Sequence, residues 1–178
     1  MMHVRKGGDN NTICYDKDCP DFNANDGTIQ LGEVLPPSNK GHDPQDIIEI
    51  NLMQDDGGIW HIYGSNSGYI GCWKGEIFSS LKEKATTMIF GGEVYTPAWS
   101  DTSPPMGSGS FQNGIPSETS YFSDILVNFN TGDTDPKNPE IVETRCYWVG
   151  DVGGGDRLEG YGFFFCGRGG KDKAKCFY

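Results

Sequence analysis

The sequence lacks any apolar run long enough to cross a membrane. Its 178 residues are 35% hydrophobic, with a mean hydropathy of −0.52. No stretch approaches the ~20 consecutive apolar residues that a spanning helix needs. The N-terminal residues 1–8 include an arginine and a lysine, but no apolar segment follows them, so they do not form a signal peptide. We therefore expect no membrane partner.

Basic residues are also scarce. The chain has 14 Lys and Arg against 25 Asp and Glu, which gives a formal net charge of −11. Because an acidic surface repels phosphate backbones, we expect no nucleic-acid partner. The same surface is compatible with an acidic compartment, since its self-repulsion weakens as the pH falls.

Several common catalytic motifs are missing. The sequence has no G-x-S-x-G, and no G-x-G-x-x-G follows a predicted strand. The segment 167–171 lacks the first glycine and the Ser or Thr of a phosphate-binding loop. The three histidines, His3, His42 and His61, are far apart in sequence, and there is no C-x-x-C pair. We therefore expect no metal site and no cofactor.

Six cysteines in a chain of this length favour an oxidising compartment. Cys14 and Cys19 are separated by four residues. This spacing permits the ~5.5–6 Å Cα separation that a disulfide prefers. Two free thiols, or two ligands of a metal, are the alternatives.

Most of the remaining sequence consists of short strand candidates between Gly, Pro, Asn and Asp residues. The segment 46–53 alternates, with Ile48, Ile50 and Leu52 on one face, which is typical of a half-buried strand. Segments 59–63 and 69–73 flank a Gly-rich turn and predict a β-hairpin. Further strands are predicted over residues 28–35, 86–95, 121–129, 141–149 and 160–166. This pattern predicts an all-β fold, an antiparallel sandwich or barrel.

One short helix is predicted over residues 75–85, where Ile77, Phe78 and Leu81 fall on one side and charged residues on the other. Residues 1–11 are predicted to be a disordered lead-in. The rest of the chain, residues 12–178, is predicted to be a single domain.

A glutamate lies inside the predicted strand 86–95. Because alternate residues of a strand share a face, Gly91, Glu93 and Tyr95 point one way, and Gly92 and its alternate neighbours point toward the core. A glycine within a strand lets another backbone approach closely. Glu93 is therefore a candidate for a groove that holds a peptide. The alternative is an ordinary exposed glutamate on a solvated face.

A series of short motifs carries a resemblance to a known family. In chain order they are Thr12-Ile13-Cys14-Tyr15, Gly58-Ile59-Trp60, Gly68-Tyr69-Ile70-Gly71, Gly91-Gly92-Glu93-Val94, Met106-Gly107-Ser108-Gly109, Cys146-Tyr147 and Gly160-Tyr161-Gly162-Phe163. Each is weak alone, but their order and spacing are specific. Together they resemble the C-terminal part of the neprosin family, the plant glutamic peptidases.

The resemblance implies an antiparallel β-sandwich that cleaves peptides after proline, at acidic pH, with two glutamates and no metal. It implies Glu93 as one catalytic glutamate, with a peptide or protein substrate that contains proline. Gly91 and Tyr95 would line the substrate groove. The implied location is extracellular or vacuolar. The implied disulfides are Cys14–Cys19 and Cys146–Cys176, and they leave Cys72 and Cys166 to pair or to stay free.

The sequence departs from the family pattern at one decisive place. The family's second glutamate lies upstream of the Cys14–Cys19 segment, and the residues that precede Cys14 contain no glutamate. We therefore expect an N-terminally truncated domain with an incomplete sandwich, inactive alone and prone to self-association through an uncovered sheet edge. The alternative function is a non-catalytic β-sandwich that binds peptide or glycan, with aromatic residues lining its groove.

Overall fold

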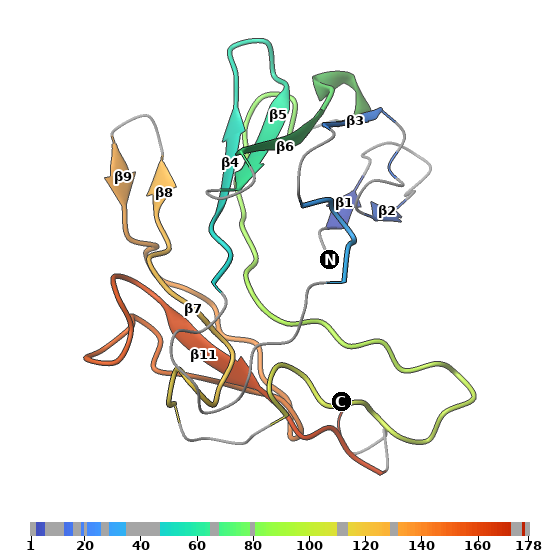
Figure 1. The fold of residues 1–178 in the computed structure, drawn as a ribbon, viewed down its shortest axis with the longest axis vertical. Coiled ribbons are helices and arrows are strands. Elements are labelled where there is room, and N and C mark those ends of the chain that lie inside the picture. Colours follow the sequence, from blue (N-terminus) through green and yellow to red (C-terminus); the bar gives the residue numbers. More distant parts are fainter. Residues whose placement is uncertain are drawn as a thin grey trace. The chain divides into compact units, whose positions relative to one another are not determined.

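The computed structural model describes residues 3–5, 13–15, 19, 21–25, 29–34, 47–64, 68–78, 81–109, 114–128, 132–171 and 176. The chain forms two compact units, one made of residues 1–37 and 46–88 and the other of residues 38–45 and 89–178. Figure 1 traces the strands of both units along the sequence. All the regular elements of the described residues are strands apart from one short 3-10 turn, so the predicted all-β class is confirmed.

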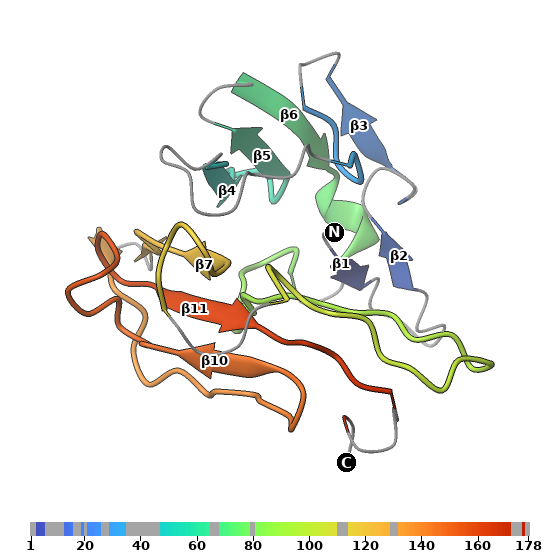
Figure 2. The same cartoon turned by 60° about the horizontal axis from the view of Figure 1, so that its bottom comes forward.

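The first unit is built on a four-stranded antiparallel sheet with the order β3-β6-β5-β4. Its strands are β3 (Phe22–Ala24), β4 (Ile50–Gln54), β5 (Trp60–Gly64) and β6 (Gly68–Trp73). Figure 2 shows β6 between β3 and β5. The predicted hairpin is confirmed as β5 and β6, and a bulge at Ile62/Tyr63 shifts the pairing by one residue.

One face of this sheet is the core of the first unit. Ile62, Ile70 and Trp73 are almost fully buried there, together with Ile77 and Phe78 from the following segment. Residues 46–53 were predicted to have one half-buried apolar face. In the structure these apolar side chains stay substantially exposed at the edge of the sheet. The strand itself is shorter than predicted and ends at Gln54.

A second, smaller ladder belongs to the same unit. Strand β1 (His3–Arg5) pairs antiparallel with β2 (Ile13–Tyr15). Residues 1–11 were predicted to be a disordered lead-in, and this is wrong for His3–Arg5. The described part of the predicted strand 28–35, residues 29–34, contains bends and turns in place of a strand.

The predicted helix over 75–85 is reduced to a single 3-10 turn, Gly75–Ile77. The next residue, Phe78, is extended, with φ −104° and ψ 143°. Side chains of the sheet then bind the carbonyl groups that a helix would use. Trp60 Nε1 donates to Leu81 O at 2.8 Å, and Gln54 Nε2 donates to Lys82 O at 2.8 Å.

The second unit contains a three-stranded antiparallel sheet with the order β10-β11-β7. Its strands are β7 (Tyr121–Phe122), β10 (Trp148–Gly150) and β11 (Phe163–Cys166), and Figure 2 shows β11 in the middle. A separate pair consists of β8 (Val127–Asn128) and β9 (Asp133–Thr134). The buried apolar residues of this unit are Ile125, Val127, Tyr147, Phe163, Phe164, Cys166 and Cys176.

Two of the predicted strands in this unit are shortened or divided for local reasons. The predicted strand 121–129 is split at Asp124, whose φ of 51° turns the chain. Residues 141–149 contribute only the start of β10, because Thr144 and Tyr147 hydrogen-bond to each other's backbone and close a tight turn.

The described part of the chain holds no helix with the length and apolar character that crossing a bilayer requires.

Candidate active site

Glu93 lies in an irregular segment of the second unit. The predicted strand over 86–95 is wrong, since these residues pair with no other strand in the described structure. Gly91, Glu93 and Tyr95 therefore do not share a sheet face, contrary to the prediction. All three are exposed to solvent, and Tyr95 keeps 81% of its surface.

The segment around Glu93 nevertheless contacts the β10-β11-β7 sheet at two points. The Phe90 ring contacts the Phe122 ring of β7, with centroids 6.1 Å apart. A Cβ atom placed on Gly92 would lie 2.6 Å from Met106 Sδ and 2.8 Å from Phe165 Cε2. Real Cβ atoms do not approach so closely, so the backbone at Gly92 rests directly on these two side chains. Glu93 is thereby held next to this contact with its side chain at the surface.

The Met106-Gly107-Ser108-Gly109 motif supplies one side of this contact. Met106 N donates to Gly167 O at 2.8 Å, and Gly167 N donates back to Met106 O at 3.1 Å. The motif thus runs antiparallel beside the residues that follow β11. Gly107 has φ +61°, and a side chain there would meet Phe165 O at 2.9 Å. Glycine is required here both by the backbone conformation and by the close approach.

The Cys146-Tyr147 motif joins the same region. Tyr147 Oη donates to Pro104 O at 2.9 Å, directly before the Met106 motif. Cys146 forms a disulfide with Cys176, with a Cα–Cα distance of 5.0 Å. This is the pairing that the resemblance implied. The motifs of Glu93, Met106 and Tyr147 therefore lie beside β11, which contains Phe163, or beside Gly167, which follows it.

The other cysteines differ in state. Cys72 and Cys166 are free thiols, the first half-buried and the second fully buried, which answers the question the sequence left open. Cys19 is buried and disulfide-bonded. The side chain of Cys14 lies outside the described residues, so the Cys14–Cys19 bond stays a prediction.

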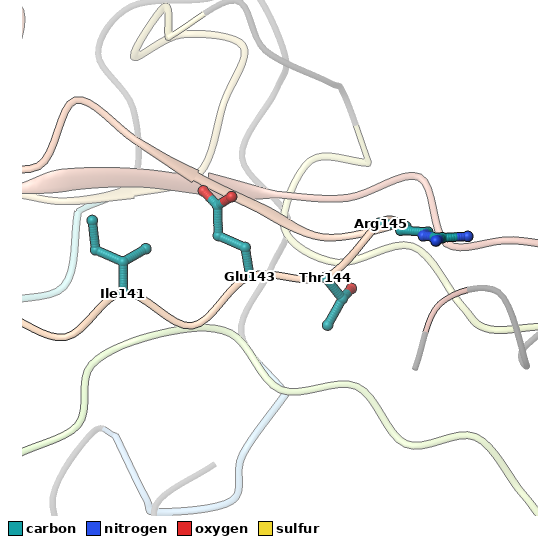
Figure 3. Close-up of a pocket in the computed structure, with 4 residues that line it drawn as sticks. All are labelled: Ile141, Glu143, Thr144 and Arg145. Carbon is teal, nitrogen blue, oxygen red and sulfur yellow. The ribbon is translucent and has the colours of Figure 1, made fainter. Parts of the chain in front are cut away.

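A pocket of about 530 Å³ lies elsewhere in the second unit, beside Ile141, Glu143, Thr144 and Arg145 (Figure 3). Ile141 and Glu143 extend to one side of the segment and Thr144 to the other. Glu143 Oε1 accepts a hydrogen bond from Val149 N at 3.2 Å, so this carboxylate covers the outer edge of β10. The residues that line this pocket do not include Gly91 or Tyr95, so it is distinct from the predicted substrate groove.

The first unit carries a polar cluster that sequence patterns did not reveal. Asp55 Oδ2 lies 3.1 Å from His61 Nε2, and Tyr69 Oη lies 3.4 Å from His61 Nδ1. The hydrogen bond to His61, and then that from Ile59 N, lowers the pKa of Asp55. Partial burial, followed by the hydrogen bond to Cys72, raises the pKa of Tyr69 to about 12. The sequence offered one signal for this cluster. Because side chains alternate along β5, His61 faces away from the core.

No group of three or more potential metal ligands occurs within the residues that the structure describes.

The chain also matches the model of a known family. The family model described as Neprosin matches residues 1–168. The chain therefore belongs to the neprosin family. The match begins at residue 1, whereas the sequence motifs placed the start of the resemblance at about Thr12.

Proposed function

We propose that this chain is the glutamic endopeptidase domain of a neprosin-like enzyme, acting on proline-containing peptides or proteins. The family match over residues 1–168 carries the proposal. The position of Glu93 supports it, since this carboxylate is exposed to water beside a backbone fixed by Gly92. By family resemblance the enzyme would act outside the cell or in the vacuole.

The proposed chemistry requires two carboxyl groups in opposite protonation states. Two neighbouring carboxylates resist ionising together, so one keeps a proton and acts as the acid while the other activates water. Glu93 is the proposed member on this chain. The residues that precede Cys14 in the sequence contain no second glutamate. The chain alone is therefore proposed to be inactive, and its partner carboxylate to come from an upstream family segment.

The substrate is proposed to lie along the segment around Glu93. Exposed backbone at Gly91, which has open space where a Cβ would stand, leaves room for an extended peptide. The exposed Tyr95 ring offers a flat apolar surface for a proline ring.

The test compares the chain alone with the chain supplemented by the upstream segment of a family member, which carries the second glutamate. Both are incubated with a proline-rich peptide at acidic pH, and the products are identified by mass spectrometry. We expect cleavage after proline only in the supplemented sample. Cleavage by the chain alone would contradict the proposal that the partner carboxylate comes from the upstream segment. Binding of the peptide without cleavage in both samples would favour the non-catalytic alternative.

A further inference from the structure

The loop that follows Glu93 carries a tryptophan in full contact with solvent. Trp99 keeps 85% of its surface, whereas Trp73 keeps 1%, and the other two tryptophans are half-buried. An indole ring that stays in water forgoes the large hydrophobic contribution of its burial. Tryptophans are enriched where proteins bind other molecules, and they often dominate the binding energy there. Trp99 is therefore a candidate contact for a ligand.

The base of this loop is closed by hydrogen bonds. Thr96 Oγ1 donates to Ser103 Oγ at 3.4 Å, which joins the two ends of the loop. Ser103 is buried, and its backbone exchanges two hydrogen bonds with Gly170, at 2.8 and 3.1 Å. Figure 2 shows the loop beyond the arrowhead of β11, in light green. The loop is thus fastened to the chain that follows β11.

The tip of the loop has a defined conformation as well. Ser100 N donates to Pro97 O at 3.0 Å, and this turn encloses Trp99. Ser100 Oγ accepts a hydrogen bond from Thr102 N at 3.2 Å and donates to Thr102 O at 3.0 Å. The ring is therefore carried by a preformed turn. A ligand that stacks on it does not have to order the loop first, which lowers the entropic cost of binding.

Trp99 lies within reach of a substrate bound at Glu93. The two residues are six positions apart in the sequence. A chain spans at most ~3.3–3.6 Å per residue, so their Cα atoms are separated by no more than ~20 Å. An extended peptide advances ~3.3 Å per residue and covers this distance with about six residues. A peptide that is cleaved at Glu93 can therefore contact Trp99 with a residue up to about six positions from the cleaved bond.

We propose that Trp99 binds a second proline of the substrate, remote from the bond that is cleaved. This inference rests on the proposed function. Proline-rich peptides form a polyproline II helix with three residues per turn, so prolines at intervals of three share one side. Such preformed helices dock on exposed aromatic rings at little entropic cost. The preferred substrates are therefore proline-rich segments with a second proline three or six residues from the cleaved bond.

The first test measures binding and needs no cleavage. A fluorescein-labelled peptide of about twelve residues, with proline at every third position, is titrated with the whole chain, and fluorescence anisotropy gives the Kd. Trp99→Ala should raise the Kd roughly tenfold, as expected when a main binding contact is removed. Trp99→Phe keeps an aromatic ring and should stay within about threefold of the wild type. Val142→Ala alters another exposed apolar residue of this unit and should leave the Kd unchanged. Equal Kd values for wild type and Trp99→Ala, or no binding by the wild type, would overturn the proposal.

The second test uses cleavage in the supplemented sample. One peptide has a proline at the cleavage site and further prolines three and six residues away, and the matched peptide has alanine at the remote positions. The wild type should show a lower KM for the first peptide. Trp99→Ala should abolish this difference without changing kcat, because the contact is the same in the bound substrate and the transition state. Equal KM values for the two peptides with the wild type would overturn the Trp99 site and leave the proposed function intact. Cleavage of neither peptide would contradict the proposed function, and the Kd of Trp99→Ala would then decide the inference.

Discussion

At the scale of single residues, Gly91 and Gly92 are neighbours with opposite surroundings. A Cβ on Gly92 would overlap Met106 and Phe165, whereas nothing lies within 4 Å of a Cβ on Gly91. The Gly92→Ala variant should therefore be destabilised by about 1–3 kcal/mol, as expected for an overpacked contact. Gly91→Ala should stay within about 0.5 kcal/mol of the wild type. Chemical denaturation of both variants measures the difference.

Equal stability of the two variants would mean that the Glu93 segment is not seated on Met106 and Phe165. The sequence indicated the wrong glycine here. Strand parity assigned the close approach to Gly91, but the segment forms no strand, so parity did not apply. The contact depends on Met106, which is distant in sequence and is brought beside Gly92 by its pairing with Gly167.

Asp55 links a turn to the sheet, and its contacts predict a pH dependence of the stability of the first unit. Its Oδ1 accepts hydrogen bonds from Gly57 N and Ile59 N, each at 2.9 Å, and its Oδ2 contacts His61. The pKa of Asp55 is lowered in the folded protein. The ionised form therefore stabilises the fold above the ordinary Asp pKa, and this contribution is lost as the pH falls through the lowered value.

Asp55→Asn should consequently lower the melting temperature at neutral pH, and the difference from the wild type should shrink below pH ~4, near the ordinary Asp value. Thermal melts across the acidic range measure this. Asp56→Asn removes the same charge at the neighbouring exposed position and should follow the wild type at every pH. A difference between wild type and Asp55→Asn that is independent of pH would show that the carboxylate charge is not involved.

At the scale of secondary-structure elements, the sequence predicted best where contacts are local. The β5–β6 hairpin follows from alternating side chains around a Gly-rich turn, and both strands were predicted within one or two residues. The helix over 75–85 failed because distant side chains decide that segment. Gln54 and Trp60 bind the carbonyl groups of Leu81 and Lys82, and no pattern within 75–85 indicates these partners.

The disulfide Cys146–Cys176 closes a loop with a sequence separation of 30 residues around β10 and β11. In the chain-entropy model a loop of this length contributes about 3–4 kcal/mol, because the bond restricts the unfolded chain. Cys176→Ser should lower the free energy of unfolding by about this amount. Denaturation under non-reducing conditions measures it.

The matched control for the disulfide is Cys72→Ser, which alters a half-buried free thiol and should have a small effect. A loss in Cys176→Ser no larger than in Cys72→Ser would show that this bond does not constrain the unfolded state.

At the scale of the whole molecule, the order of short motifs identified the family although each motif alone is weak. In the structure, the motifs around Glu93, Met106 and Tyr147 lie beside β11 or beside Gly167, which follows it. Sequence order could reveal the family but not this arrangement, which depends on the isolated bridges and glycine contacts between distant segments.

The most direct test of the proposed function is the activity of the Glu93→Gln variant in the supplemented system. Glu140→Gln, an exposed glutamate of the same unit, is the matched control. Cleavage after proline at acidic pH should fall by a factor of ~100 or more in Glu93→Gln, as expected when a catalytic acid or base is lost, and should be unchanged in Glu140→Gln. Equal cleavage by wild type and Glu93→Gln would contradict the assignment of Glu93.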